Sequence, residues 1–190
     1  MDAMEVAQRM TAEEFLDLPV PERGRPWSLV GGEVVVNDPA PLHQEVAGDL
    51  EYALQAWARS PGGSGAVRRP LDVRLDPSNV FAPDILWYAQ GRTPARQALP
   101  PSPMPDLAVE VRSPSTWRYD VGAKKAGYER HGLPELWLVD TTAEAVLAFR
   151  RSTPGAPSFD VALELDRDHE LASPQLPGFS LALAQLFPRG

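Results

Sequence analysis

Two carboxylates and a pair of lysines are the side chains of this sequence that could carry out hydrolytic chemistry together. Glu110 lies within the apolar run LAVEV, and Asp84 lies within the similar run VFAPDILWY. Both lysines of the chain, Lys124 and Lys125, follow Glu110 by one strand-to-helix step, although arginine is used at every other basic position. Two carboxylates can share a divalent cation, and a lysine ammonium can orient a water without occupying one of the metal's ligand positions.

Glu110 is expected to share one strand face with Asp106, Ala108 and Arg112, because side chains alternate along a strand. A carboxylate in such a run is costly to bury unless it is ion-paired, hydrogen-bonded or bound to a metal. One interpretation is an ion pair with Arg112 or a neighbouring arginine. Asp106 cannot share a metal ion with Glu110, since four residues of strand separate the two by about 13 Å. Asp84, on a strand expected to be adjacent, is the better partner.

The residues leave alternatives open for Asp84 and for the lysines. Asp84 could instead cap the start of its own strand, directly after Pro83. Lys124 and Tyr128 are four residues apart and so share one face of the predicted helix, from which Lys124 could reach back to the carboxylates. Two lysines on a surface helix are also commonly solvated.

The elements that must position these residues alternate between helices and strands. A capping box at Thr11 and Glu14 predicts a short helix within MTAEEFLDLP. WSLVGGEVVVN predicts a β-hairpin that turns at Gly31-Gly32. The apolar spacing of residues 42–60 predicts a long amphipathic helix.

The remaining segments predict mostly strands around one further helix. Strands are predicted at 66–75, 80–89, 107–111, 135–140, 145–151 and 159–165, a helix at 118–131, and a proline-rich loop at 90–104. This order predicts an α+β, or mixed α/β, fold in which helices pack on a mixed sheet. We expect residues 1–190 to form a single domain.

Composition and charge exclude several classes of function. The 190 residues are 43% apolar, which suits a soluble domain with its own core. Neither a membrane-spanning run nor a signal peptide is recognisable, so the expected location is cytoplasmic. The absence of cysteine excludes disulfides, thiolate catalysis and cysteine-type zinc sites. A net charge of -8 argues against a surface coated for nucleic acid, although a basic cleft or a bound cation could supply local positive charge.

Motifs over most of the chain resemble those of the Uma2 family, a group of proposed endonucleases with the PD-(D/E)xK, or restriction-endonuclease-like, fold. The matching segments, in family order, are MTAEEFLDLP, LVGGEVVVNDPAPLHQEVAGDL, PLDVRLDPSNVFAPDILW, PDLAVEVRSPSTWRYDVGAKKAGYERHGLPELWLVD and LPGFSLALAQLF. The central pattern is PD before an apolar residue, then VEVxSPST, D-x3-K-x3-Y and LWLVD. The resemblance implies a central mixed sheet flanked by helices, with an N-terminal helix and hairpin.

The resemblance also implies catalytic roles for Asp84, Glu110 and Lys124. Asp84 and Glu110 match the two motif acids. The position two residues after Glu110 is Arg112, where nucleases of this fold often have lysine, so the lysine is implied to have moved to the following helix as Lys124. Lys125 is then expected to face solvent.

A metal site is implied by the same resemblance. Asp84, Glu110 and the backbone carbonyl of Val111 would hold Mg²⁺, with Mn²⁺ as an alternative. The ion would lower the pKa of a bound water and stabilise charge developing on the scissile phosphate.

Four further residues are implied to be accessory. Asp120 and Tyr128 would hold the catalytic lysine in place. His43 would line the cleft, or would be an ordinary helix-start residue. Glu33, in the hairpin, would be an accessory acid, or would simply be solvated.

The function implied is Mg²⁺-dependent hydrolysis of DNA phosphodiester bonds by a homo-oligomer. A dimer is favoured, because nucleases that cut both strands often pair two active sites. One alternative is a non-catalytic nucleic-acid-binding or oligomerisation module built on the same fold. Another is a metal-dependent hydrolase of a small phosphorylated metabolite, which the acidic charge suits.

Overall fold

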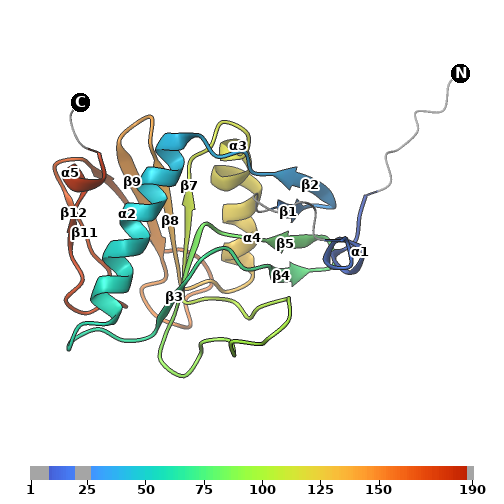
Figure 1. Ribbon diagram of the computed structural model, residues 1–190, viewed down its shortest axis with the longest axis horizontal. Coiled ribbons are helices and arrows are strands. Elements are labelled where there is room, and N and C mark those ends of the chain that lie inside the picture. The colour runs from blue at the N-terminus through green and yellow to red at the C-terminus, as the bar shows by residue number, and fades with distance from the viewer. Residues whose placement is uncertain (1–8, 20–26, 188–190) are drawn as a thin grey trace, which may run out of the picture.

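The computed structural model describes residues 9–19 and 27–187, and a six-stranded sheet lies at its centre (Figure 1). In order across the sheet the strands are β10 (Val161–Asp166), β9 (Ala145–Arg150), β8 (Glu135–Asp140), β7 (Leu107–Val111), β6 (Ile85–Tyr88) and β3 (Ala66–Arg68). β7 and β8 are parallel, and the other neighbours are antiparallel. The predicted mixed sheet is therefore confirmed.

A second sheet of four strands contains the predicted N-terminal hairpin. Its order is β2 (Glu33–Val36), β1 (Trp27–Val30), β5 (Asn79–Phe81) and β4 (Val73–Asp76). The hairpin turns at Gly31 and Gly32, whose φ angles of 59° and 83° lie in the region that glycine adopts without strain. The helix α1 (Ala12–Leu16) begins at the predicted capping box and packs Phe15 into a small apolar cluster with residues of β1 and β5.

Two segments that the sequence predicted as single strands are each divided between the two sheets. Residues 66–75 supply β3 to the large sheet and β4 to the small one, and residues 80–89 supply β5 and β6. Each division contains a proline, Pro70 or Pro83, which lacks the N–H that a strand interior requires. The second crossover places Asp84 between the two sheets, directly before the first residue of β6.

The helix α2 (Pro41–Ala58) lies across one face of the large sheet (Figure 1). The side chains that the sequence placed on its apolar face, Val46, Leu50, Leu54 and Trp57, are buried in the main core. Along β7, Leu107, Val109 and Val111 point into this core, whereas Ala108 belongs to a cluster on the opposite face. This alternation confirms that Glu110 faces away from α2.

A helical segment on that opposite face consists of α3 (Trp117–Tyr119), a π-helical turn η1 (Asp120–Lys124) and α4 (Lys125–Arg130). It matches the predicted helix, but the π-turn was not predicted. Tyr128 is fully buried and packs edge-on against Phe81, with ring centroids 5.1 Å apart. Gly127 permits this approach, since a Cβ there would lie 2.8 Å from Phe81 Cε2.

The C-terminal residues form β11 (Glu170–Leu171), β12 (Leu181–Ala182) and α5 (Leu183–Leu186). Glu135 of β8 fixes this region, because its buried carboxylate accepts hydrogen bonds from Ser173 Oγ at 2.6 Å and from Trp137 Nε1 at 2.7 Å. Within residues 9–19 and 27–187, no helix has the length and apolar character needed to cross a membrane.

Candidate active site

Asp84 and the end of β7 meet at one edge of the large sheet. Asp84 Oδ2 accepts a hydrogen bond from the backbone N–H of Val111 at 2.8 Å, so the carboxylate binds the neighbouring strand and does not merely cap its own. The C=O and N–H of one residue in a strand point to the same side. The Val111 carbonyl is therefore directed toward the side of Asp84, and Glu110 precedes it on the same strand.

Lys124 reaches Glu110 from the π-turn. Its Nζ lies 2.7 Å from Glu110 Oε1 and 2.9 Å from Asp120 Oδ1, and the side chain is almost completely buried. Tyr128 OH donates a hydrogen bond to Glu110 Oε1 at 2.8 Å. Both donors use the same oxygen of Glu110, so Oε2 carries neither bond. Asp120 therefore contacts the lysine as expected, whereas Tyr128, which was also expected to hold the lysine, donates to Glu110 instead.

Arg112 is not the partner of Glu110, and the alternative of an ion pair between them is wrong. Arg112 Nη1 donates to both carboxylate oxygens of Asp140 at 2.9 Å, and its guanidinium lies over the ring of Trp117. Arg112 therefore joins β8 to the start of α3. The cation that contacts Glu110 comes from the helical segment instead.

The SPST segment holds Asp120 through two buried hydroxyl groups, a role that sequence reasoning missed. Thr116 Oγ1 donates to Asp120 Oδ2 at 2.9 Å, and Ser113 Oγ lies 2.8 Å from Thr116 Oγ1. Asp120 thus divides its two oxygens between Thr116 and Lys124. The signal in the sequence was a run of small hydroxyl residues between a buried strand and a helix start, where such side chains bond to nearby polar groups.

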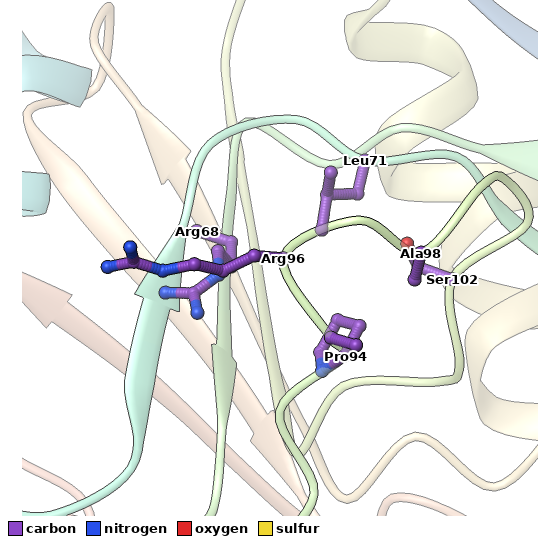
Figure 2. Close-up of a pocket in the computed structure, with 7 residues that line it drawn as sticks. Arg68, Leu71, Pro94, Arg96, Ala98 and Ser102 are labelled. Carbon is purple, nitrogen blue, oxygen red and sulfur yellow. The ribbon is translucent and has the colours of Figure 1, made fainter.

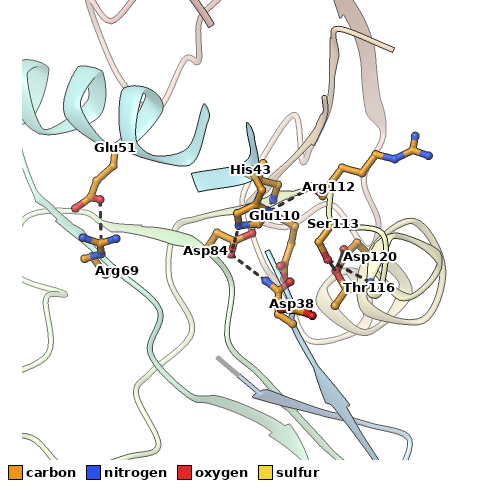
Figure 3. A network of polar contacts seen from close by, with 12 residues as sticks. Asp38, His43, Glu51, Arg69, Asp84, Glu110, Arg112, Ser113, Thr116 and Asp120 are labelled. Carbon is orange, nitrogen blue, oxygen red and sulfur yellow. Dashed lines mark hydrogen bonds and ion pairs between the residues drawn. The ribbon is translucent and has the colours of Figure 1, made fainter. Parts of the chain in front are cut away.

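His43 lies in the first turn of α2 and contacts Asp84 (Figure 3). Its Nε2 is 3.2 Å from Asp84 Oδ1, and its Nδ1 is 3.3 Å from the carbonyl oxygen of Arg112. Both neighbours are hydrogen-bond acceptors, so only the doubly protonated ring can donate to both. Burial opposes the charged ring, but Asp84 and the carbonyl outweigh it, and the pKa of His43 is raised.

Comparison with known proteins identifies the family of this chain. The family model named Uma2 and described as "Putative restriction endonuclease" matches residues 12–184. The chain belongs to the Uma2 family. Family membership supports a nuclease role.

A solved structure shares the fold of this Uma2 chain. It is the "putative nuclease belonging to DUF820 from Anabaena variabilis ATCC 29413", with a TM-score of 0.76 and 19% sequence identity. The match covers 94% of this chain and 97% of that protein. No curated protein matches the chain.

The buried centre of this Uma2 protein places three carboxyl groups beside two basic side chains. Three carboxylates, Asp84, Glu110 and Asp120, face Lys124 and His43. Burial raises the pKa of Glu110 to about 8 although Lys124 opposes this, and the charges of Asp120 and Asp84 add to the rise. Burial also opposes the charge of Lys124, but Asp120 and Glu110 raise its pKa, so it stays protonated. When Glu110 is ionised, the three carboxylates outnumber the two cations, and a divalent cation would offset this excess negative charge and favour the ionised form of Glu110.

Asn37 supplies an oxygen that sequence reasoning did not single out. Its Nδ2 lies 3.5 Å from Asp84 Oδ1, and its Oδ1 is buried with no hydrogen-bond partner in the described part of the chain. A buried acceptor without a donor is rare and costly. The amide that carries this orphan oxygen contacts Asp84, and an amide oxygen is a ligand type that Mg²⁺ accepts, so Asn37 is a candidate for a further metal ligand near that acid.

The oxygen ligands at this site suit Mg²⁺ better than they suit an ion that takes all of its ligands from the protein. Among the described residues, no group of three or more His, Asp or Glu side chains is arranged to hold an ion. Mg²⁺ usually takes only one or two carboxylates from the protein and completes its shell with water and substrate phosphate. Two carboxylates with a backbone carbonyl beside them therefore fit this ion.

Two acids lie outside the centre. Glu33 is exposed and accepts a hydrogen bond from Tyr119 OH at 2.9 Å, which ties β2 to α3. Asp106 accepts a hydrogen bond from the backbone N–H of Ala89 and pairs with Arg92 at 3.3 Å. Neither contact involves Glu110.

Lys125 does not face open solvent as expected. Its Nζ lies 4.5 Å from the ring centroid of Phe149 and 5.8 Å from that of Phe159, and the side chain is half-buried. An aromatic face attracts an ammonium group and shields it from water. The two lysines thus point to different environments, and only Lys124 reaches the acids.

Proposed function

We propose that this protein is a metal-dependent endonuclease that hydrolyses DNA phosphodiester bonds at a PD-(D/E)xK-type centre. The observation that carries the proposal is the contact of Lys124 Nζ with Glu110 Oε1, beside a second buried carboxylate at the start of the neighbouring strand. Membership of the Uma2 family and the nuclease-like fold support the same reaction class. The motif acids are Asp84 and Glu110, and the lysine is Lys124.

Asp84, Glu110 and the carbonyl of Val111 would hold Mg²⁺, or Mn²⁺ in its place. When bound, the ion supplies charge stabilisation for the scissile phosphate and increases the acidity of water. On Glu110 the metal ligand would be Oε2, since both donors to this carboxyl group contact Oε1. Asp84 would bind the ion through oxygens that also accept from the Val111 N–H and contact His43.

Lys124 acts as a charged donor and not as a base, because its raised pKa keeps the proton on Nζ. The ammonium has three N–H groups, of which two contact Glu110 and Asp120. The third is available to the attacking water or to a phosphate oxygen. Fixed donors of this kind lower a barrier by meeting charge where it develops in the transition state.

Tyr128 and His43 orient the two acids. The pKa of Tyr128 is raised by burial and by the negative charge of Glu110, so its O–H remains a donor to that carboxylate. The imidazolium of His43 donates to Asp84. Each acid is therefore held by a group that keeps its own proton.

Cleavage of supercoiled plasmid tests the reaction class. Purified protein with Mg²⁺ or Mn²⁺ is expected to convert it to nicked and linear forms, and EDTA is expected to stop the conversion. Single-stranded DNA, RNA and a generic phosphomonoester, assayed in parallel, define the substrate class. Hydrolysis of the phosphomonoester alone would replace the endonuclease by a small-metabolite hydrolase, and no reaction with any of them would contradict the proposal.

A further inference from the structure

A cavity of about 300 Å³ lies beside the edge strand β3, apart from the centre formed by Asp84, Glu110 and Lys124 (Figure 2). Its lining residues are Arg68, Leu71, Pro94, Ala95, Arg96, Ala98 and Ser102. The charged residues among them are both arginines, and Figure 2 shows the two guanidinium groups extending to the same side. An acidic protein thus has a locally basic pocket.

The two cavity arginines are not neutralised by carboxylates. Within residues 9–19 and 27–187, neither Arg68 nor Arg96 has a carboxylate at ion-pair distance, whereas neighbouring arginines do. Arg69 pairs with Glu51 (Figure 3), and Arg92 pairs with Asp106. Arg68 Nη1 donates to a backbone carbonyl of its own strand, which leaves its other N–H groups for a ligand.

The wall of the cavity is fixed at several points. The loop between β6 and β7 is tied down by the backbone N–H of Ser102, which donates to Asp72 O at 2.7 Å. Tyr88 OH donates to Pro103 O at 2.9 Å, and Arg92 Nη2 donates to Met104 O at 3.3 Å. These bonds hold the loop against the sheet, so the pocket is part of the fold.

Strand register places the cavity on the same face of the sheet as the centre. Arg68 is paired with Leu86, and Leu86 with Ala108. Directly paired residues share a face, as do residues two apart on one strand, so Arg68 shares its face with Asp84 and Glu110. One strand spacing and two residues of rise separate the Cα atoms of Arg68 and Asp84 by about 8 Å.

We propose that this cavity is a phosphate-binding subsite that holds the backbone of the nucleic-acid substrate about one to three nucleotides from the scissile bond. The planar forks of Arg68 and Arg96 suit the oxygens of one phosphate, and Leu71 and Pro94 offer an apolar surface to the adjoining sugar or base. This inference rests on the proposed function, because it assigns the pocket to the same substrate. It explains how an acidic protein engages a polyanion.

Binding of a short labelled duplex, measured by fluorescence anisotropy in EDTA, tests the subsite without any cleavage. The variants are Arg68→Gln, Arg96→Gln and both together. Arg59→Gln is the matched control, since Arg59 is exposed at the end of α2 on the other face of the sheet. The double variant is expected to bind about tenfold more weakly, and Arg59→Gln as the wild type does.

A salt series separates phosphate contacts from a general loss of structure. Between about 50 and about 200 mM salt, the slope of log affinity against log salt should fall by about one unit in the double variant, equally for duplexes of different sequence. Arg68→Lys keeps the charge and is expected to keep most of the slope. Circular dichroism of each variant should match that of the wild type.

The outcomes distinguish this subsite from the proposed function. If the double variant binds the duplex as tightly as the wild type does, the subsite is overturned and the nuclease proposal stays intact. A second outcome would replace the backbone contact by a free phosphate ligand. In it, the wild type binds no duplex, and inorganic phosphate raises the melting temperature of the wild type but not that of the double variant. The subsite is also overturned if the double variant cleaves DNA with the KM and the duplex affinity of the wild type.

Discussion

Lys124 Nζ lies 2.7 Å from Glu110 Oε1, although the lysine belongs to a helical segment and the acid to a central strand. The π-turn from Asp120 to Lys124 makes this possible, because it ends with Lys124 directed at the sheet while Asp120 lies beside it. π-turns are rare and occur frequently at functional sites. Lys124 therefore reaches Glu110 from the helical segment, although the position two residues after Glu110 on the strand is Arg112.

Replacement of Lys124 should affect stability far more than replacement of its neighbour. Lys124→Met leaves Glu110 and Asp120 buried without their shared cation, and unpairing a buried charge costs about 3–5 kcal/mol. Lys125→Met removes only an ammonium over aromatic rings and should cost about 1 kcal/mol or less. Urea unfolding of both variants makes the comparison. Equal losses would contradict the assignment of Lys124 to the buried centre.

Gly127 should tolerate no added methyl group. In Gly127→Ala, the Cβ would lie 2.8 Å from Phe81 Cε2, and relief of the clash must displace α4 or the ring. We expect a loss of about 1–3 kcal/mol in unfolding free energy and a larger relative loss of activity, because α4 carries Tyr128. Gly122→Ala is the control, since no atom lies within 4 Å of its added Cβ. That variant should be neutral or more stable.

Stability should fall as pH rises, because of Glu110. Its pKa is about 8 in the folded protein and 4.5 as an isolated group. Between these values the folded state holds a proton that the unfolded state has lost, so raising the pH favours unfolding. The raised pKa of His43 acts in the same direction. Urea unfolding from about pH 5 to about pH 8 should show a steeper decline for the wild type than for Glu110→Gln; parallel curves would contradict this prediction.

Asn37 should matter for metal binding and not for folding. Asn37→Ala removes an unpaired buried oxygen, so unfolding free energy should change by less than about 1 kcal/mol. Mn²⁺ affinity, measured by calorimetry, should fall by about tenfold if the oxygen is a ligand of the ion. Asn79→Ala, which removes an amide at the first residue of β5, is the comparison that should leave metal affinity unchanged. An unaltered Mn²⁺ affinity in Asn37→Ala would remove Asn37 from the donor set.

Some of the site could be predicted because it depends on strand periodicity. Alternation along LAVEV placed Glu110 on the face of Ala108, opposite Leu107, Val109 and Val111, and this prediction is confirmed. It also excluded Asp106 as a partner of Glu110, and Asp106 pairs with Arg92 instead. The adjacency of Asp84 followed from the two apolar runs being neighbours in a sheet. These inferences need only the geometry of one strand pair.

Other features depend on contacts between distant segments, which local patterns do not encode. Arg112 pairs with Asp140 because β8 runs parallel to β7, so that the ends of the two strands lie side by side. Lys125 lies over Phe149 because β9 passes under α4. The contact of Asn37 with Asp84 depends on how the N-terminal hairpin packs against the start of β6, which the local sequence does not predict. In each case the partner is at least two elements away in the sequence.

The most direct test of the central claim is plasmid cleavage by Asp84→Asn, Glu110→Gln and Lys124→Met, each compared with wild type in saturating Mg²⁺ and Mn²⁺. Glu164→Gln, on the exposed edge strand β10, serves as the control. The account predicts that metal-dependent cleavage falls by at least about 100-fold in all three variants and is unchanged in the control. Cleavage at the wild-type rate in folded Asp84→Asn and Glu110→Gln would contradict it.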